Sequence, residues 1–150
     1  VGTMDQAASM IGNVTGALTL FLGSVAAISL IVGGIGIMNI MLVSVTERTS
    51  EIGLRKALGA TSRNILVQFL CEAVILTGLG GFLGVLIGSG LSLLISQAIL
   101  QFTTFKWVFV FPVSGAILGV VVATVTGVIF GIYPAKQAAS KSPIEALRYE

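Results

Sequence analysis

The sequence has no histidine and a single cysteine, and these two shortages exclude several kinds of site. Without histidine there is no ordinary transition-metal site and no Ser-His-Asp or Cys-His catalytic group, and Cys71 alone cannot form a disulfide within the chain. The sequence also lacks the Gly-x-x-x-x-Gly-Lys-Ser/Thr loop that binds nucleotide phosphates, and the basic surface that binds nucleic acid. We therefore expect a chain that is not an enzyme, binds no cofactor or metal itself and has no nucleic-acid partner.

Charged residues are also few, with eight Lys and Arg and six Asp and Glu, and they leave long apolar stretches between them. No charge occurs in residues 6–46, 73–105 or 107–135. Each stretch exceeds the ~20 apolar residues with which a helix crosses about 30 Å of hydrocarbon. A soluble domain of this length would need more charged residues to cover its surface. The sequence therefore predicts an all-α membrane protein with three transmembrane helices, at about residues 16–45, 64–97 and 112–133.

The distribution of positive charge indicates how these helices are oriented. Seven of the eight Lys and Arg residues lie in segments 46–63 and 134–150, which the positive-inside rule places in the cytoplasm. The N-terminus then lies outside, with residues 1–13 as the expected end of an extracytoplasmic stalk. Because an external N-terminus needs something upstream to carry it across, we expect the C-terminal part of a larger polypeptide, or a processed chain.

Two ladders of small residues run along the second and third predicted helices. A step of four residues keeps them on one side of a helix, where small side chains allow two backbones to approach closely. Glycine is frequent in membrane helices, so chance is the alternative, but two runs of five favour packing between helices. The ladder residues are Gly80, Gly84, Gly88, Ser92 and Ser96 in one helix, and Gly115, Gly119, Ala123, Gly127 and Gly131 in the other.

The predicted helices contain few polar side chains that would serve transport chemistry. No ionisable residue lies deep within a span, and ion-coupled carriers normally need such residues. Glu72 is two to three turns into the second helix, near the expected inner interface. Asn39, Asn64 and Gln68 are expected to bond between helices rather than to line a transport site.

The cytoplasmic segment between the first two spans has the features of a short amphipathic helix. It is expected to run from about Ser50 to Gly59, a common C-terminal cap. Leu54 and Leu58 lie four residues apart on one face, and Glu51 and Arg55 are spaced for an ion pair. A surface loop whose basic residues only set the topology is the alternative, but such a loop would need neither a cap nor an apolar edge.

Two further capping signals follow. Thr61 or Ser62 is expected to cap the second span. Ser142-Pro143-Ile144-Glu145 is a capping box with proline at the first helical position, which predicts a short C-terminal amphipathic helix over residues 143–149.

Four motifs together resemble a known family. They are GGIGIMNIM (residues 33–41), VTERTSEIGLRKALGA (45–60), PAKQAA (134–139) and PIEALR (143–148). A chain with these motifs resembles the FtsX-like permease domain of ABC transporters, most closely the C-terminal part of the MacB type of macrolide and peptide exporters. The resemblance covers residues 12–150, and the run from Glu47 to Ala60 is its most specific part.

The resemblance implies an architecture and partners. Such permeases have four transmembrane helices with a large extracytoplasmic domain between the first and second, so residues 14–150 would be the FtsX-like permease domain with the last three helices. They lie in the bacterial cytoplasmic (inner) membrane as multi-pass proteins, with the C-terminus in the cytoplasm. The implied partners are an ABC ATPase subunit or domain that binds ATP and Mg, a second permease copy, membrane lipid and, in some systems, an extracytoplasmic adaptor.

The resemblance also assigns the short cytoplasmic helix a role, as the coupling region that lies on the ATPase. ATP hydrolysis would move this helix and, through the spans, the extracytoplasmic part, for export of a drug, peptide or lipidated cargo. One alternative is a non-transporting FtsX-like signal transmitter that activates an extracytoplasmic partner; another is a small pore-forming or structural protein, against which the coupling-like segment argues. Leu54 and Leu58 would be buried against the ATPase, with charged residues around them. The expected coupling residues are Glu47, Arg48, Glu51, Ile52, Gly53, Leu54, Arg55, Lys56, Leu58 and Gly59.

Overall fold

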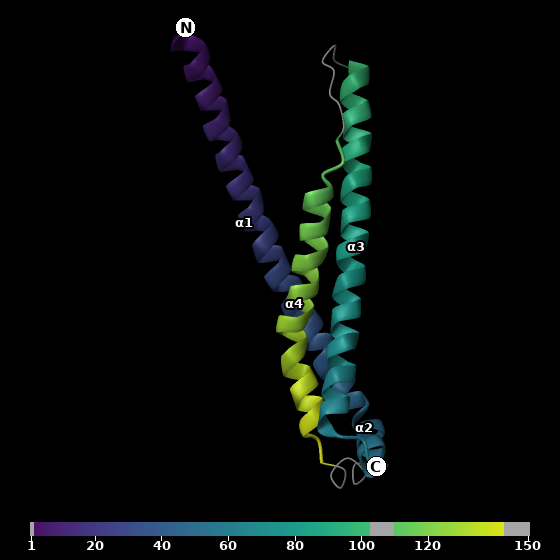
Figure 1. Ribbon diagram of the computed structural model, residues 1–150. Helices are drawn as coiled ribbons and strands as arrows, with labels where there is room; N and C mark the ends of the chain where they lie inside the picture. The colour runs from purple at the N-terminus through teal and green to yellow at the C-terminus, as the bar shows by residue number, and fades with distance from the viewer. Residues whose placement is uncertain (1, 103–109, 143–150) are drawn as a thin grey trace. The chain divides into compact units, whose positions relative to one another are not determined.

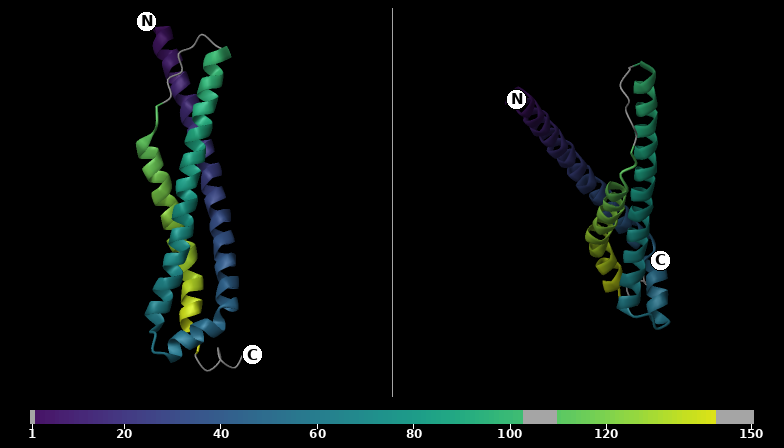
Figure 2. Two further views of the ribbon diagram at one scale, coloured as in Figure 1. Left: turned by 90° about the vertical axis from the view of Figure 1, so that its right-hand side faces the viewer. Right: turned by 45° about the horizontal axis from the view of Figure 1, so that its top comes forward.

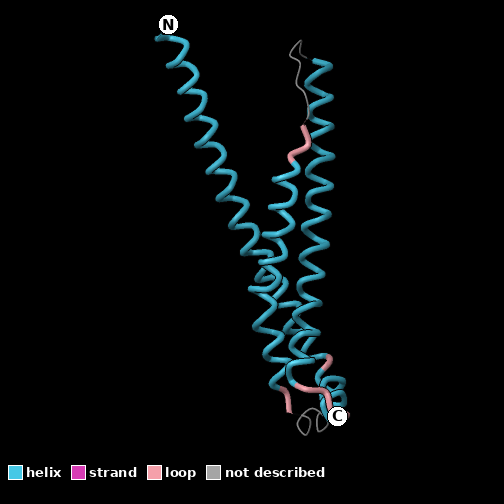
Figure 3. The backbone as a smooth tube through the Cα atoms, viewed as in Figure 1, coloured by secondary structure: helices cyan, strands magenta, loops and turns pink. Residues whose placement is uncertain are grey.

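The computed structural model describes residues 2–102 and 110–142, and these residues form four helices and no strand (Figures 1 and 3). The helices are α1 (Gly2–Glu47), α2 (Thr49–Ala57), α3 (Ser62–Phe102) and α4 (Val113–Ser140). Helices α1, α3 and α4 are each long and apolar enough to cross a membrane. The predicted all-α fold with three membrane-length helices and one short helix is therefore confirmed. The predicted C-terminal helix at 143–149 lies outside the described residues.

The long helices extend beyond the predicted spans. Helix α1 begins at Gly2, so most of the segment expected as the end of a stalk is helical and continuous with the first span. Helix α3 begins at Ser62, and the Asn64 backbone N–H donates to Thr61 Oγ1 at 3.3 Å, so Thr61 caps this helix as predicted. The ends of a helix do not mark the membrane surface, so the limits of the spans and domains stay predictions.

Helix α4 extends beyond residue 133, the predicted end of the third span. It continues through Pro134 to Ser140. A proline inside a helix removes one backbone hydrogen bond and crowds the preceding turn. Pro134 is nevertheless less than 2% exposed, and Ala135 and Ala138 beside it belong to the core. Packing of this end of α4 holds the helix together across the proline, and the sequence pattern alone does not contain that packing.

The chain divides into two units, residues 1–33 and 34–150. The first unit is the N-terminal part of α1, in which the side chains from residue 3 to 29 are all exposed. The second unit contains the rest of α1 and the other three helices. Its core brings together the end of α1, the short α2, the start of α3 and the end of α4 (Figure 2). The core residues are Met41, Val45, Ile52, Ile65, Phe69, Ala73, Ala135 and Ala138.

Helices α3 and α4 lie side by side, and small residues line their contact (Figures 1 and 2). A Cβ added at Gly127 would lie 2.1 Å from Thr77 Oγ1, and one added at Gly131 would lie 2.6 Å from the Ala73 Cβ. Both distances are shorter than any side chain tolerates, so each glycine is needed for the approach of α3. Gly119, two steps before Gly127 on the same ladder, faces Val85 at an ordinary 3.7 Å.

The three glycines of the predicted α3 ladder are not in close contact with α4. A Cβ added at Gly80, Gly84 or Gly88 would meet no atom within 4 Å, whereas one at Gly81 would lie 2.7 Å from the Ala123 Cβ. Consecutive helical residues point about 100° apart, so residues 80 and 81 belong to different faces. Gly115 is in ordinary contact only with Pro112, just before its own helix, at 3.6 Å. Packing of Gly80, Gly84, Gly88 and Gly115 against another helix therefore stays a prediction.

Candidate functional site

The short helix α2 is bounded as the sequence predicts. It spans Thr49–Ala57, and Gly59 follows with a φ of +100°. The Gly59 N–H donates to the Lys56 carbonyl at 3.0 Å and the Ala60 N–H to the Arg55 carbonyl at 2.9 Å. This pair of bonds is a Schellman cap, which satisfies two carbonyls that the helix end would otherwise leave free. The turn from α2 into α3 is therefore short and hydrogen-bonded.

Replacing Gly59 by valine is expected to lower the free energy of unfolding by about 1–2 kcal/mol, because positive φ crowds a Cβ against the backbone. No other atom lies within 4 Å of a Cβ at this position, so the loss would come from the backbone conformation and not from a clash. Gly59→Asn should cost less, because asparagine visits positive φ more readily. Chemical unfolding of the purified protein, followed by circular dichroism, measures both. Equal stability of the two variants and the parent would contradict this role.

One side of α2 is built into the core of the second unit. Ile52 is 1% exposed and belongs to the core cluster with Val45 of α1 and Phe69 of α3, and Gly53 is also buried. These two predicted coupling residues thus face inward. They hold the helix in place and leave its other side to meet a partner.

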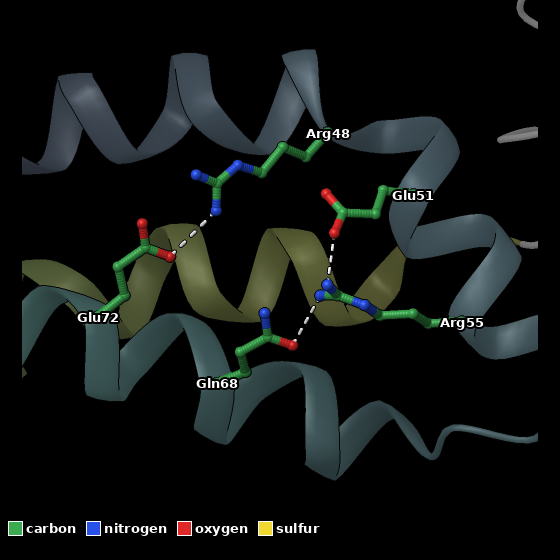
Figure 4. A network of polar contacts seen from close by, with 5 residues as sticks. All are labelled: Arg48, Glu51, Arg55, Gln68 and Glu72. Atoms are coloured by element: carbon green, nitrogen blue, oxygen red, sulfur yellow. Dashed lines mark hydrogen bonds and ion pairs between the residues drawn. The ribbon is translucent and has the colours of Figure 1, made fainter.

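Polar side chains tie α2 to α3 (Figure 4). Arg55 forms the predicted ion pair with Glu51 and also donates to Gln68 Oε1 of α3 at 2.9 Å. Arg48, between α1 and α2, pairs with Glu72 of α3 at 3.4 Å. All these side chains are partly exposed, and each such pair contributes less than about 1 kcal/mol, so their main effect is to orient α2 along α3. The expected bonding of Gln68 between helices is confirmed, whereas the sequence had no signal that pairs Glu72 with Arg48.

Lys56 points toward α4. Its Nζ donates to the backbone carbonyls of Ala139 at 2.5 Å and Lys141 at 2.8 Å. From the sequence, Lys56 is predicted to be one of the charged residues around the ATPase contact. Its bonds to α4 join residues 83 and 85 positions apart, so the local sequence pattern does not predict them. Arg48, Arg55 and Lys56 therefore all have partners within this chain.

The outer side of α2 is apolar and open. Leu54 is 53% exposed and Leu58 is 80% exposed. Ser50 and Ala57 are exposed on the same short helix, and Glu47 is exposed at the end of α1. We call Leu54 and Leu58 the outer edge. Two leucines held four residues apart on a helix anchored from behind make a small, rigid apolar surface suited to a protein partner.

These features define a helical membrane protein in which a short anchored helix connects two membrane-length helices and presents an exposed apolar edge. Residues 23–143 match the FtsX-like permease C-terminal family, and since they are most of the chain, the chain belongs to this family. The resemblance stated from the sequence motifs is thereby confirmed, and with it a multi-pass membrane permease.

Curated relatives agree with the family. The "Uncharacterized ABC transporter permease YknZ" of Bacillus subtilis (strain 168) is 52% identical over 150 residues, which are 100% of this chain and 36% of that protein. The "Macrolide export ATP-binding/permease protein MacB" of Bdellovibrio bacteriovorus is 54% identical over 133 residues, 89% of this chain and 20% of that protein. MacB of Wolinella succinogenes is 53% identical over 146 residues, 95% and 22% respectively. The chain thus spans about a fifth to a third of the length of these relatives.

Proposed function

We propose that this chain is the permease part of an ABC-type complex and that the outer edge of α2 docks on the ATPase. The observation that carries the proposal is the division of α2 into two sides. Ile52 is locked into the core, while Leu54 and Leu58 stay exposed at 53% and 80%. The printed names of the relatives, an ABC transporter permease and ATP-binding/permease proteins, support an ATPase as the partner.

Movement of the ATPase would pass to the membrane helices through rigid connections. Helix α2 is joined directly to α1 and, through the capped turn at Gly59, to α3. The end of α1 packs in the same core as α2, so it would move with α2. This coupling needs two arrangements of rigid elements and no pore lined by polar residues.

In this proposal the ATPase, as a separate subunit or a domain of the whole protein, binds ATP and Mg²⁺ and supplies the energy. The permease works as a dimer in the lipid of the bacterial inner membrane, with the N-terminus outside and the α2 side in the cytoplasm. The relatives named for macrolide export favour outward movement of a drug, peptide or lipidated cargo. In some systems an extracytoplasmic adaptor would take part.

Photo-cross-linking tests the docking directly. A benzophenone amino acid is placed at Leu54 or Leu58 of the complete permease, in membranes that contain its ATPase. We expect both positions to cross-link to the ATPase. The same probe at Leu94 of α3, an apolar position that is 64% exposed, is the control and should give no ATPase product. Absence of an ATPase product from Leu54 and Leu58 would overturn the proposal, as would equal labelling from Leu94.

A further inference from the structure

Two backbone carbonyls at the C-terminal end of α4 accept hydrogen bonds from a side chain of another helix. The last carbonyls of a helix lack partners within it, and nearby cations commonly satisfy them. The last turn of α4 has no basic residue of its own, and the Lys141 N–H reaches only the Ala138 carbonyl, at 3.4 Å. Lys56 of α2 supplies the missing donors, at 2.5 Å to the Ala139 carbonyl and 2.8 Å to the Lys141 carbonyl.

The contact between α2 and α4 has an apolar part beside this polar one. Ile52 of α2 lies in the same core cluster as Ala135 and Ala138 of α4, and the two alanines are 0% exposed. The ammonium group of Lys56 also suits the negative end of the α4 dipole. Lys56 thus caps α4 at the point where α4 joins the core.

The order of the helices in the sequence shows why the contact between α2 and α4 matters. Helix α2 is joined by short connections to α1 before it and α3 after it, so both must follow any displacement of α2. Helix α4 has no such connection to α2, because the whole of α3 lies between them in the sequence. The contact of α3 with α4 brings small residues together, Ala73, Thr77 and Gly81 against Ala123, Gly127 and Gly131, and it also includes larger side chains such as Leu70 and Val85. The bonds from Lys56 give α4 a second attachment, directly to α2, beside its contact with α3.

We propose that Lys56 is a latch that ties the coupling helix to α4, so that a displacement of α2 reaches α4 together with α1 and α3. The inference rests on the proposed function and deepens it. Lys56 is a positioning residue, because its side chain acts on the end of α4 inside the permease.

The experiment measures the distance between α2 and α4 in the complete protein with its ATPase. Spin labels are attached to cysteines that replace the exposed residues Ser50 of α2 and Ser140 of α4, after Cys71 and any other cysteines are changed to serine. Distances are recorded by double electron–electron resonance, without nucleotide and with a non-hydrolysable ATP analogue. With Lys56 present we expect one narrow distance that is the same in both states.

In Lys56→Met we expect a broad distribution of distances between the two labels. We also expect this distribution to change when the ATP analogue is added. Lys56→Arg, which keeps a donor of positive charge, should restore the single narrow distance, and Lys136→Met, which removes an exposed cation of α4, should leave it unchanged. An unchanged narrow distance in Lys56→Met would overturn the latch.

A separate measurement, capture of the ATPase, tests the proposed function independently of the role of Lys56. If the ATPase is captured equally well when Leu54 and Leu58 are changed to aspartate, docking on the outer edge is wrong. The nucleotide-free distances still decide the latch in that case: broadening in Lys56→Met supports the tie between α2 and α4, and an unchanged distance overturns it.

Discussion

Replacing both Leu54 and Leu58 by aspartate is expected to abolish capture of the ATPase from membranes and ATP-driven function, while the permease keeps its helical content. Burial of a leucine at a contact contributes about 1.5–3 kcal/mol, so losing two removes several kcal/mol. Each aspartate would also place an unpaired charge in a contact that excludes water. Since every 1.4 kcal/mol changes affinity tenfold, the double variant should bind the ATPase at least a hundredfold more weakly.

The measurement is a pull-down of the ATPase with the complete permease, with ATPase stimulation determined in the same samples. Ile52→Asp is the matched comparison on the same helix, because Ile52 is 1% exposed whereas Leu58 is 80% exposed. The core substitution should lower the amount of folded protein, and the outer substitutions should not. Normal capture by the Leu54→Asp/Leu58→Asp variant would show that the ATPase docks elsewhere.

Replacing Gly127 and Gly131 by leucine is expected to force α3 and α4 apart and to destabilise the permease strongly. The first atom of each new side chain would already lie within 2.1 Å of Thr77 and 2.6 Å of Ala73. Overpacking of a tight contact costs about 1–3 kcal/mol per site, and relief here requires movement of a whole helix. Thermal unfolding in detergent, followed by circular dichroism, measures the loss.

Gly84→Leu is the matched control, because a Cβ at Gly84 meets no atom within 4 Å. It should leave the stability of the monomer within about 0.5 kcal/mol of the parent, as surface substitutions usually do. Cross-linking of the permease in membranes then tests the predicted packing of the α3 ladder. A smaller dimer fraction in Gly84→Leu would support it, and a loss of monomer stability equal to that of Gly127→Leu would contradict the assignment of the α3–α4 contact.

Much of the fold follows from local properties of the chain. Long charge-free stretches predict membrane-length helices because burying charge in hydrocarbon is costly. The cap at Gly59 follows from its freedom at positive φ, and the pair of Glu51 with Arg55 follows from helical spacing. Each of these depends on residues a few positions apart, so each can be derived before any tertiary structure is known.

Other features depend on residues far apart in the sequence. Gly127 and Gly131 of the α4 ladder lie against α3, whereas a Cβ at Gly80, Gly84 or Gly88 of the α3 ladder would meet no atom within 4 Å. The four-residue period shows which residues share a side of a helix, but it does not show which helix that side faces. Helix α4 continues through Pro134 because its end is buried in the core. The bonds of Lys56 to Ala139 and Lys141 of α4 join residues 83 and 85 positions apart, so no local pattern in the sequence predicts them.

Composition and short-range pattern alone thus predict an all-helical membrane protein, the place of its short helix in the sequence and the residues that end that helix. The tertiary structure decides which side of α2 is free. Ile52, Arg55 and Lys56 are held by α3, α4 and the core, and the large apolar side chains of Leu54 and Leu58 remain open. The physical reason is that helical periodicity sets which residues share a face, whereas the packing of neighbouring helices sets which face is covered.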